Sequence, residues 1–183
     1  MAIIRQTGER DLEGVFVLVN SNLDDFFPPS VITFFYEQWP QGQFVATDVF
    51  GNILGAICGS RLEGGRASVS LFAVDEGSRG IGIGGQLLDA FRRRCLMDGF
   101  GTIQLEVRTS NALAKGFYEK RGFRVSEFLP GFYNDGGDGY RMVAFVTGCR
   151  SGRALPRKKR RRAFPASGDH FHAHTPIVFD CGR

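Results

Sequence analysis

The 183 residues, 43% of them hydrophobic, are enough for one globular domain with a core and a tail. No apolar run approaches the ~18 residues that span a bilayer and no charged-then-apolar leader opens the chain, so we expect a soluble cytoplasmic protein without a membrane partner. The net charge of +4 is uneven: residues 150–183 hold nine Lys/Arg and two Asp, which leaves 14 basic and 17 acidic residues before them, a net of −3.

In the first third of the chain, the sequence predicts a strand, two helices and a β-hairpin. Leu12, Val15, Phe16 and Val19 recur at the spacing of one helix face, with Asp11 near the cap. The predicted elements are a strand at Ile3 and Ile4, a helix over 11–19, a loop over 20–30, a helix over 31–38, and hairpin strands over 43–48 and 53–61.

The next part of the chain alternates strands with helices. Side chains alternate over 102–107, which puts Glu106 on the face opposite Leu105. The predicted elements are strands over 67–74 and 102–107, helices over 86–98 and 112–121, and strands over 124–129 and 138–146. We therefore expect an α/β domain over residues 1–147, with a mixed, mostly antiparallel sheet flanked by helices, and a basic C-terminal tail over 148–183.

A glycine-rich stretch, Arg79-Gly80-Ile81-Gly82-Ile83-Gly84-Gly85, lies between a predicted strand and a predicted helix. Bare amides at a helix N-terminus bind phosphate oxygens, so the stretch predicts a phosphate-bearing ligand. A P-loop is excluded because Gly85-Gln86 stands where Lys-Ser/Thr is needed. About 65 residues precede the glycines, which argues against the first turn of a dinucleotide-binding fold.

The stretch resembles the acyl-CoA pyrophosphate loop of the GNAT superfamily of N-acetyltransferases. A second motif follows in the expected order: Leu105-Glu106-Val107-Arg108-Thr109-Ser110-Asn111, then Ala114 and Phe117-Tyr118-Glu119-Lys120-Arg121-Gly122-Phe123. The resemblance covers about residues 3–146. It is strongest to the RimI-like and Ard1-like protein N-terminal acetyltransferases, whose carboxy-terminal hairpin is similar to residues 132–142. The GNAT fold is the expectation that follows.

Acetyl transfer to an amine needs one group that takes a proton and one that protonates the leaving thiolate. The resemblance implies that Glu106 is the general base and that Tyr118, on the following helix, is the general acid. The residues alone also allow a solvated strand carboxylate at Glu106 and a core aromatic at Tyr118.

The resemblance also implies acetyl-CoA as cosubstrate and no metal. Arg79 faces either a phosphate or solvent, and Asn111 contacts the cosubstrate, caps its helix or does both. The cofactor-binding residues that we expect are Phe72, Ala73 and Val74, through their backbone, then Arg79, Gly80, Ile81, Gly82, Ile83, Gly84, Gly85 and Asn111.

Substrate selection is expected from two loops. By resemblance, Leu23, Asp25 and Phe27 belong to a first peptide-binding loop, and Phe132 and Tyr133 to a hairpin where the related enzymes often carry Tyr-Tyr. Asp25 binds the substrate ammonium or a polar side chain, or is an ordinary turn carboxylate.

We therefore expect an enzyme that acetylates the α-amino group of protein N-termini, on ribosomal proteins or nascent chains. Alternatives are a small-molecule or lysine side-chain acetyltransferase and a non-catalytic module that binds CoA and the ribosome. The enzyme would act as a monomer or with an auxiliary subunit.

The basic run from Arg157 to Arg162 is either a solvated tail, an RNA or ribosome contact, or a nuclear import signal. His170, His172 and His174 follow it without a Cys or Glu to complete a metal site.

Overall fold

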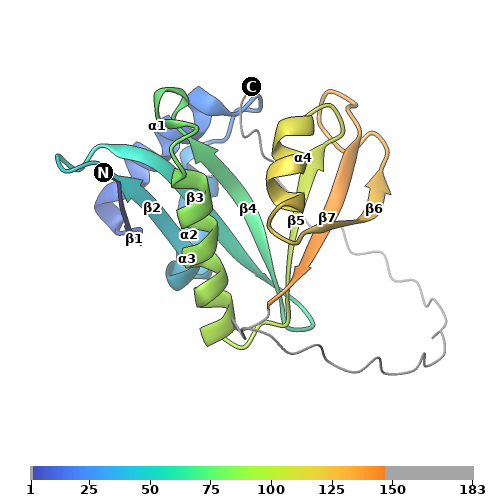
Figure 1. Cartoon of the computed structure of the whole chain (residues 1–183). Coiled ribbons are helices and arrows are strands. Elements are labelled where there is room, and N and C mark those ends of the chain that lie inside the picture. Colours follow the sequence, from blue (N-terminus) through green and yellow to red (C-terminus); the bar gives the residue numbers. More distant parts are fainter. Residues whose placement is uncertain (1, 147–183) are drawn as a thin grey trace.

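The computed structural model describes residues 2–146, which form one seven-stranded sheet with helices on both faces (Figure 1). The strand order is β1-β2-β3-β4-β5-β7-β6, and only β4 and β5 run parallel. The strands are β1 Ile3–Gln6, β2 Gln43–Thr47, β3 Ile53–Leu62, β4 Arg66–Val74, β5 Thr102–Arg108, β6 Arg124–Leu129 and β7 Gly139–Phe145. The helices are α1 Leu12–Asn22, α2 Pro29–Gln38, α3 Ile83–Met97 and α4 Ala112–Glu119. The predicted mixed, mostly antiparallel α/β class is confirmed.

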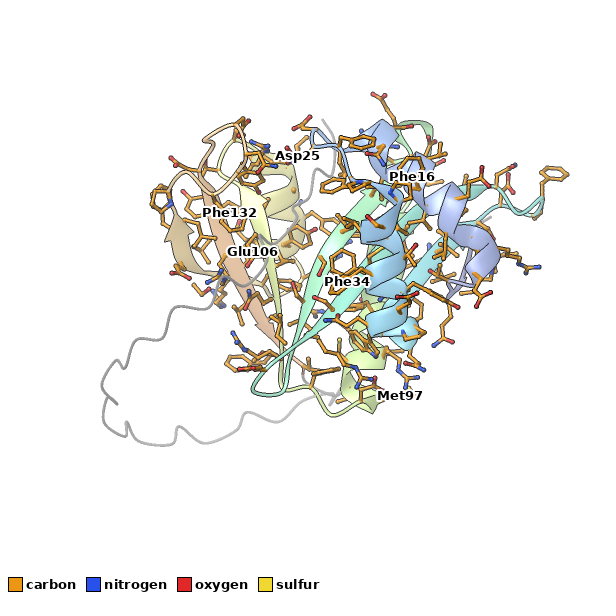
Figure 2. The ribbon with its side chains drawn as sticks, turned by 180° about the vertical axis from the view of Figure 1, so that it is seen from behind. Phe16, Asp25, Phe34, Met97, Glu106 and Phe132 are labelled. Atoms are coloured by element: carbon orange, nitrogen blue, oxygen red, sulfur yellow. The ribbon has the colours of Figure 1, made fainter. Side chains whose placement is uncertain are left out.

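Two helices cover each face of the sheet. α3 and α4 lie on the face seen in Figure 1, and α1 and α2 lie on the face seen in Figure 2. Neighbouring side chains of β4 divide between the two: Phe72 and Val74 join the core under α3 and α4, whereas Leu71 and Ala73 join the core under α1 and α2. β4 is therefore buried from both sides, which suits its apolar run from Leu71 to Val74.

Several predicted boundaries were wrong by a few residues. α1 continues to Asn22 and α2 begins at Pro29, so the predicted loop over 20–30 shrinks to residues 23–28. Proline suits the first helical position because its missing N–H has no helical partner there. α3 begins at Ile83, directly after Gly82, so part of the glycine stretch is helix.

The helix predicted over 112–121 ends at Glu119. Within residues 2–146, no helix has the length and apolar character to cross a membrane. The run from Arg157 to Arg162, the three histidines and the proposed boundary at 147 lie outside the described residues.

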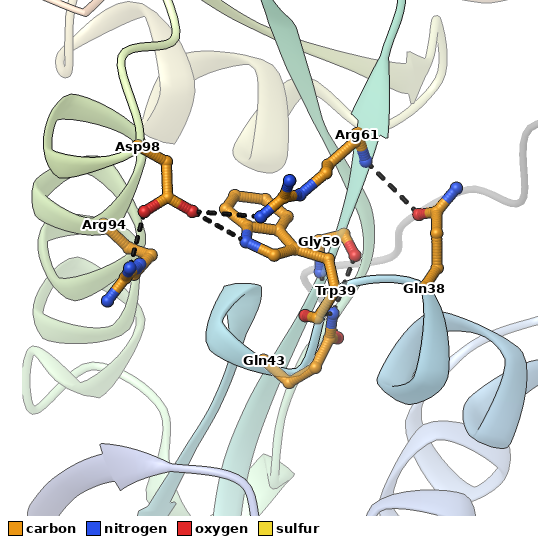
Figure 3. A network of polar contacts seen from close by, with 7 residues as sticks. All are labelled: Gln38, Trp39, Gln43, Gly59, Arg61, Arg94 and Asp98. Atoms are coloured by element: carbon orange, nitrogen blue, oxygen red, sulfur yellow. Dashed lines mark hydrogen bonds and ion pairs between the residues drawn. The ribbon is translucent and has the colours of Figure 1, made fainter.

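Gln43 fills an irregularity of β3 with hydrogen bonds. The register with β4 shifts between Cys58 and Gly59, beside Gln43. Gln43 Nε2 donates to the carbonyls of Phe35, Trp39 and Gly59 at 3.0, 2.8 and 2.8 Å, and its Oε1 accepts from the Gly59 N–H at 3.1 Å (Figure 3). One buried side chain thus satisfies backbone groups of α2, the following turn and β3.

An aspartate joins the ends of α2 and α3 in the same region (Figure 3). Asp98 accepts from Trp39 Nε1 at 2.9 Å and pairs with Arg94 Nη2 at 2.5 Å and Arg61 Nη2 at 3.4 Å. Burial opposes the charge of this carboxyl, yet the hydrogen bonds from Arg94 and Trp39 hold the pKa of Asp98 below its ordinary value. The network fixes α3, whose first turn lies at the glycine stretch.

Replacing Gln43 with Leu should destabilise the fold, because it removes the hydrogen bonds that Gln43 makes with the buried carbonyl and N–H of Gly59. We expect a loss of about 2–3 kcal/mol in the free energy of unfolding and a Tm lower by roughly 5–10 °C. Gln38→Leu is the matched control, since Gln38 accepts from the Arg61 N–H at an exposed site where water can replace it. Equal Tm values for the two variants would contradict this account.

Candidate functional site

The only parallel strand pair among residues 2–146 is short, and the two strands then separate. β4 and β5 are in register from Arg66–Thr102 to Ser68–Gln104 and no further. Beyond that point β4 stays paired with β3, and β5 with β7 (Figure 1). Beyond Ser68 and Gln104 the two strands are no longer ladder partners, although both lie in the middle of the sheet, so an extended ligand can pair between them as an added strand.

Strand alternation shows which backbone groups of β4 face this gap. Asp75 N–H donates to the Leu54 carbonyl of β3 at 2.9 Å. Because the pairs in an antiparallel ladder alternate, the amides and carbonyls of Val74 and Phe72 turn away from β3 and toward β5. Those of Ala73 turn toward β3, so the predicted backbone contact falls on Phe72 and Val74.

The glycine stretch places free amides at the start of α3. Gly80 and Gly82 have φ angles of 78° and 90°, which side-chain-bearing residues rarely adopt. The Gln86 N–H donates to the Gly82 carbonyl at 3.1 Å, so the amides of Ile83, Gly84 and Gly85 precede the first intrahelical donor of α3. This geometry fits an anionic phosphate oxygen.

Arg121, which the sequence analysis did not select, lies beside these amides. A Cβ at Gly85 would stand 2.8 Å from Arg121 Nη2, so glycine is what allows the guanidinium to approach the first turn of α3. Arg121 also stacks 3.7 Å from the Phe117 ring centroid and donates to the Phe117 carbonyl. The site thus combines bare amides with a held cation, and this pair suits a diphosphate.

Arg79 is half-buried and forms hydrogen bonds within the protein. Its Nε donates to the Val74 carbonyl at 3.0 Å and its Nη2 to Asn22 Oδ1 at 2.8 Å, which fastens the glycine stretch to α1. Asn111 does cap α4, because its Oδ1 accepts from the Ala114 N–H at 2.9 Å.

Glu106 is a buried, ion-paired carboxylate, with 2% of its surface exposed. Its Oε1 accepts from Gln104 Nε2 at 2.9 Å and from Arg141 Nε at 2.8 Å, across the β5–β7 register. Arg141 pairs with Glu127 as well. Both donors to Glu106 use Oε1, so Oε2 accepts no hydrogen bond from the described residues. The alternative of a solvated strand carboxylate at Glu106 is therefore wrong.

Tyr118 lies on the other side of β5. It is fully buried, with its ring centroid 5.2 Å from that of Phe117 and 5.5 Å from that of Phe123. Leu105 and Val107 belong to the same core, whereas Glu106 alternates to the opposite face. The two predicted catalytic side chains therefore approach the β4–β5 gap from opposite faces of the sheet.

Both predicted substrate loops lie at the open end of the gap, where Figure 2 shows Asp25 and Phe132 on the same side of Glu106. Leu23 and Phe27 are buried in the core under α1 and α2, and the exposed ring of the first loop is Phe26. The buried Tyr133 hydroxyl has no hydrogen-bond partner among residues 2–146. Burial raises the pKa of Tyr133, so the hydroxyl keeps its proton at neutral pH.

These features can be compared with known proteins. Residues 13–123 match the acetyltransferase (GNAT) family. The chain belongs to the GNAT acetyltransferase family. It is accordingly an N-acetyltransferase, and GNAT membership implies acetyl-CoA as cosubstrate. The gap, the bare amides and the cation at Arg121 fit a thioester carrying a diphosphate. Among the described residues, no group of three His, Cys, Asp or Glu side chains is arranged to hold a metal ion.

Three relatives of this GNAT chain align over most of its length. It is 34% identical over 142 residues to an uncharacterised N-acetyltransferase of Methanocaldococcus jannaschii, which covers 77% of the chain and 90% of that protein. It is 30% identical over 141 residues to N-alpha-acetyltransferase 30 of Schizosaccharomyces pombe, which covers 73% and 91%. The crystal structure of Ard1 from Thermoplasma volcanium matches with a TM-score of 0.77 and 35% identity, over 80% of this chain and 99% of that one. The predicted family is confirmed.

Gly82→Ala should weaken acetyl-CoA binding. A side chain at a φ of 90° costs about 1–2 kcal/mol and shifts the first turn of α3. Losing one charged hydrogen bond, worth about 1.5–3 kcal/mol, raises the KM for acetyl-CoA roughly tenfold or more. Gly51→Ala imposes similar strain at a φ of 91° in the β2–β3 hairpin and should leave this KM unchanged. Equal KM values for the two variants would contradict the assignment.

Proposed function

We propose that this GNAT enzyme transfers the acetyl group of acetyl-CoA to the α-amino group of protein or peptide N-termini. One observation carries the proposal: the buried carboxylate of Glu106 is fixed beside the β4–β5 gap and below two loops that frame its open end. The relative from Schizosaccharomyces pombe that is named as an N-alpha-acetyltransferase supports the choice of an α-amine.

The binding of acetyl-CoA falls to backbone groups. The amides of Ile83, Gly84 and Gly85, with Arg121 beside them, would hold the diphosphate, and Phe72 and Val74 would pair with the extended arm. Bound there, acetyl-CoA supplies an activated acetyl thioester. The fixed amides cost no reorganisation on binding, because α3 already orients them.

Glu106 and Tyr118 would move the protons. Oε2 of Glu106 accepts a proton from the substrate ammonium, directly or through water, while Arg141 and Gln104 hold Oε1. The Tyr118 hydroxyl donates a proton to the sulfur that leaves. A base and an acid on opposite faces of the sheet can act on one amine and one sulfur in the gap between them.

The substrate backbone would bind between residues 23–28 and 131–138. The buried hydroxyl of Tyr133 lacks a hydrogen-bond partner among the described residues. It would be satisfied by donating a hydrogen bond to a carbonyl of the bound peptide. Phe132 adds an apolar wall without a hydroxyl, and Asp25 lies on the facing loop. Leu23 and Phe27 would shape that loop from below, since both are buried.

Incubating the full chain with acetyl-CoA and a peptide library that varies the first two residues tests the substrate class. Peptides with free α-amines should be acetylated, and the same peptides with blocked α-amines and internal lysines should not. Acetylation confined to lysine side chains or small amines would overturn the α-amine assignment and leave GNAT membership intact.

Glu106→Gln and Tyr118→Phe should each lower kcat by about 10²–10⁴-fold, the usual contribution of a general base or acid. Glu127→Gln and Tyr140→Phe are the matched controls, because Glu127 pairs with the same Arg141 and Tyr140 stacks on Phe128 away from the gap. Circular dichroism should show that all four variants fold. A kcat equal to that of the wild type in both Glu106→Gln and Tyr118→Phe would show that neither residue is the general base or acid.

A further inference from the structure

Arg108 is the one residue whose contacts reach both substrate loops from the strand that carries Glu106. It ends β5 on the same face as Glu106, two residues along the strand and therefore about 7 Å away. Its charged side chain is only 13% exposed, and Glu106 on the same face pairs with Arg141 and not with Arg108. The contacts that compensate this burial lie in the two loops.

On the β6–β7 loop, Arg108 is held by a carboxylate and an aromatic ring. Nη1 donates to both oxygens of Asp135 at 2.9 Å, and the guanidinium carbon lies 3.8 Å from the Tyr133 ring centroid. A Cβ at Gly137 would come within 2.8 Å of Nη1, so this glycine leaves room for the guanidinium.

On the α1–α2 loop, the same guanidinium meets two further carboxylates. Nη2 lies 3.5 Å from Asp25 Oδ2, and Nε lies 4.0 Å from Asp24 Oδ2. The first loop is thereby joined to the second through Arg108, although Asp25 and Asp135 are far apart in the sequence. No other residue in the described part of the chain forms ion pairs with both loops.

We infer that Arg108 is a positioning residue that holds the α1–α2 and β6–β7 loops together as one rigid rim, and that Asp25 acts through Arg108 and not by contacting the substrate. The inference rests on the proposed function, because the two loops are taken to bind the peptide that is acetylated. A rim ordered before binding lowers the entropy that the peptide must overcome. Lysine cannot replace Arg108 fully, because a single ammonium neither stacks on Tyr133 nor spans three carboxylates.

The test begins with kinetics of full-length Arg108→Gln, using the best peptide from the amino-terminal library. The KM for the peptide should rise about tenfold, with kcat and the KM for acetyl-CoA changed by less than about threefold, the pattern of lost uniform binding. Arg108→Lys should recover only part of the loss. Arg5→Gln is the matched control, because Arg5 also pairs with an aspartate, at 2.6 Å, but joins β1 to Asp11, the residue before α1. A wild-type peptide KM in Arg108→Gln would overturn the inference.

A double-mutant comparison separates positioning from direct contact. If Asp25 acts through Arg108, Asp25→Asn should raise the peptide KM in the wild type and add nothing in the Arg108→Gln background. If Asp25 binds the substrate ammonium itself, the two effects multiply, and the second half of the inference is wrong.

Amide hydrogen exchange without substrate keeps the test independent of the proposed function. Arg108→Gln should speed exchange over residues 23–28 and 130–138, whereas Arg5→Gln should not. If the wild type acetylates no peptide, the proposed function fails, and the exchange result alone decides whether Arg108 orders the rim. Unchanged exchange in both loops would overturn that role.

Discussion

The short parallel pairing of β4 and β5 is the constraint on which the rest of the site depends. Three register pairs hold the strands together, and beyond Ser68 their other neighbours, β3 and β7, hold them apart. A strand edge that has lost its neighbour can accept an extended ligand as an added strand. In the proposed binding mode, acetyl-CoA would depend on how the sheet is assembled more than on particular side chains.

The side chains of β5 alternate between the two faces of the sheet, and the polar ones share one face. Leu105 and Val107 join the core that contains Tyr118, and the other face carries Gln104, Glu106 and Arg108. Gln104 and Arg141 orient the carboxylate of Glu106, and Arg108 reaches the substrate loops. Gln104, the proposed base Glu106 and the proposed positioning residue Arg108 therefore follow one another on one face of β5.

Local signals made much of this predictable from the sequence. The glycine stretch and the alternation over 102–107 each lie within a few residues. The first predicts a phosphate site, and the second predicts that Glu106 lies on the face of the strand opposite Leu105. The partners of the charged residues were not predictable, because Arg141 lies 35 positions from Glu106 and Asp25 lies 83 positions from Arg108. Arg79 shows the same limit: its sequence context suggests phosphate or solvent, and the fold gives it Asn22, 57 positions away.

Amide hydrogen exchange of the full chain, with and without saturating acetyl-CoA, tests the central claim most directly. If the β4–β5 gap and the start of α3 hold the cosubstrate, the amides of Val74 and of residues 83–85 should exchange more slowly when it is bound, because they gain acceptors. Residues 43–47 of β2, away from the gap, should be unchanged. Protection that appears elsewhere while these amides keep their rates would contradict the account.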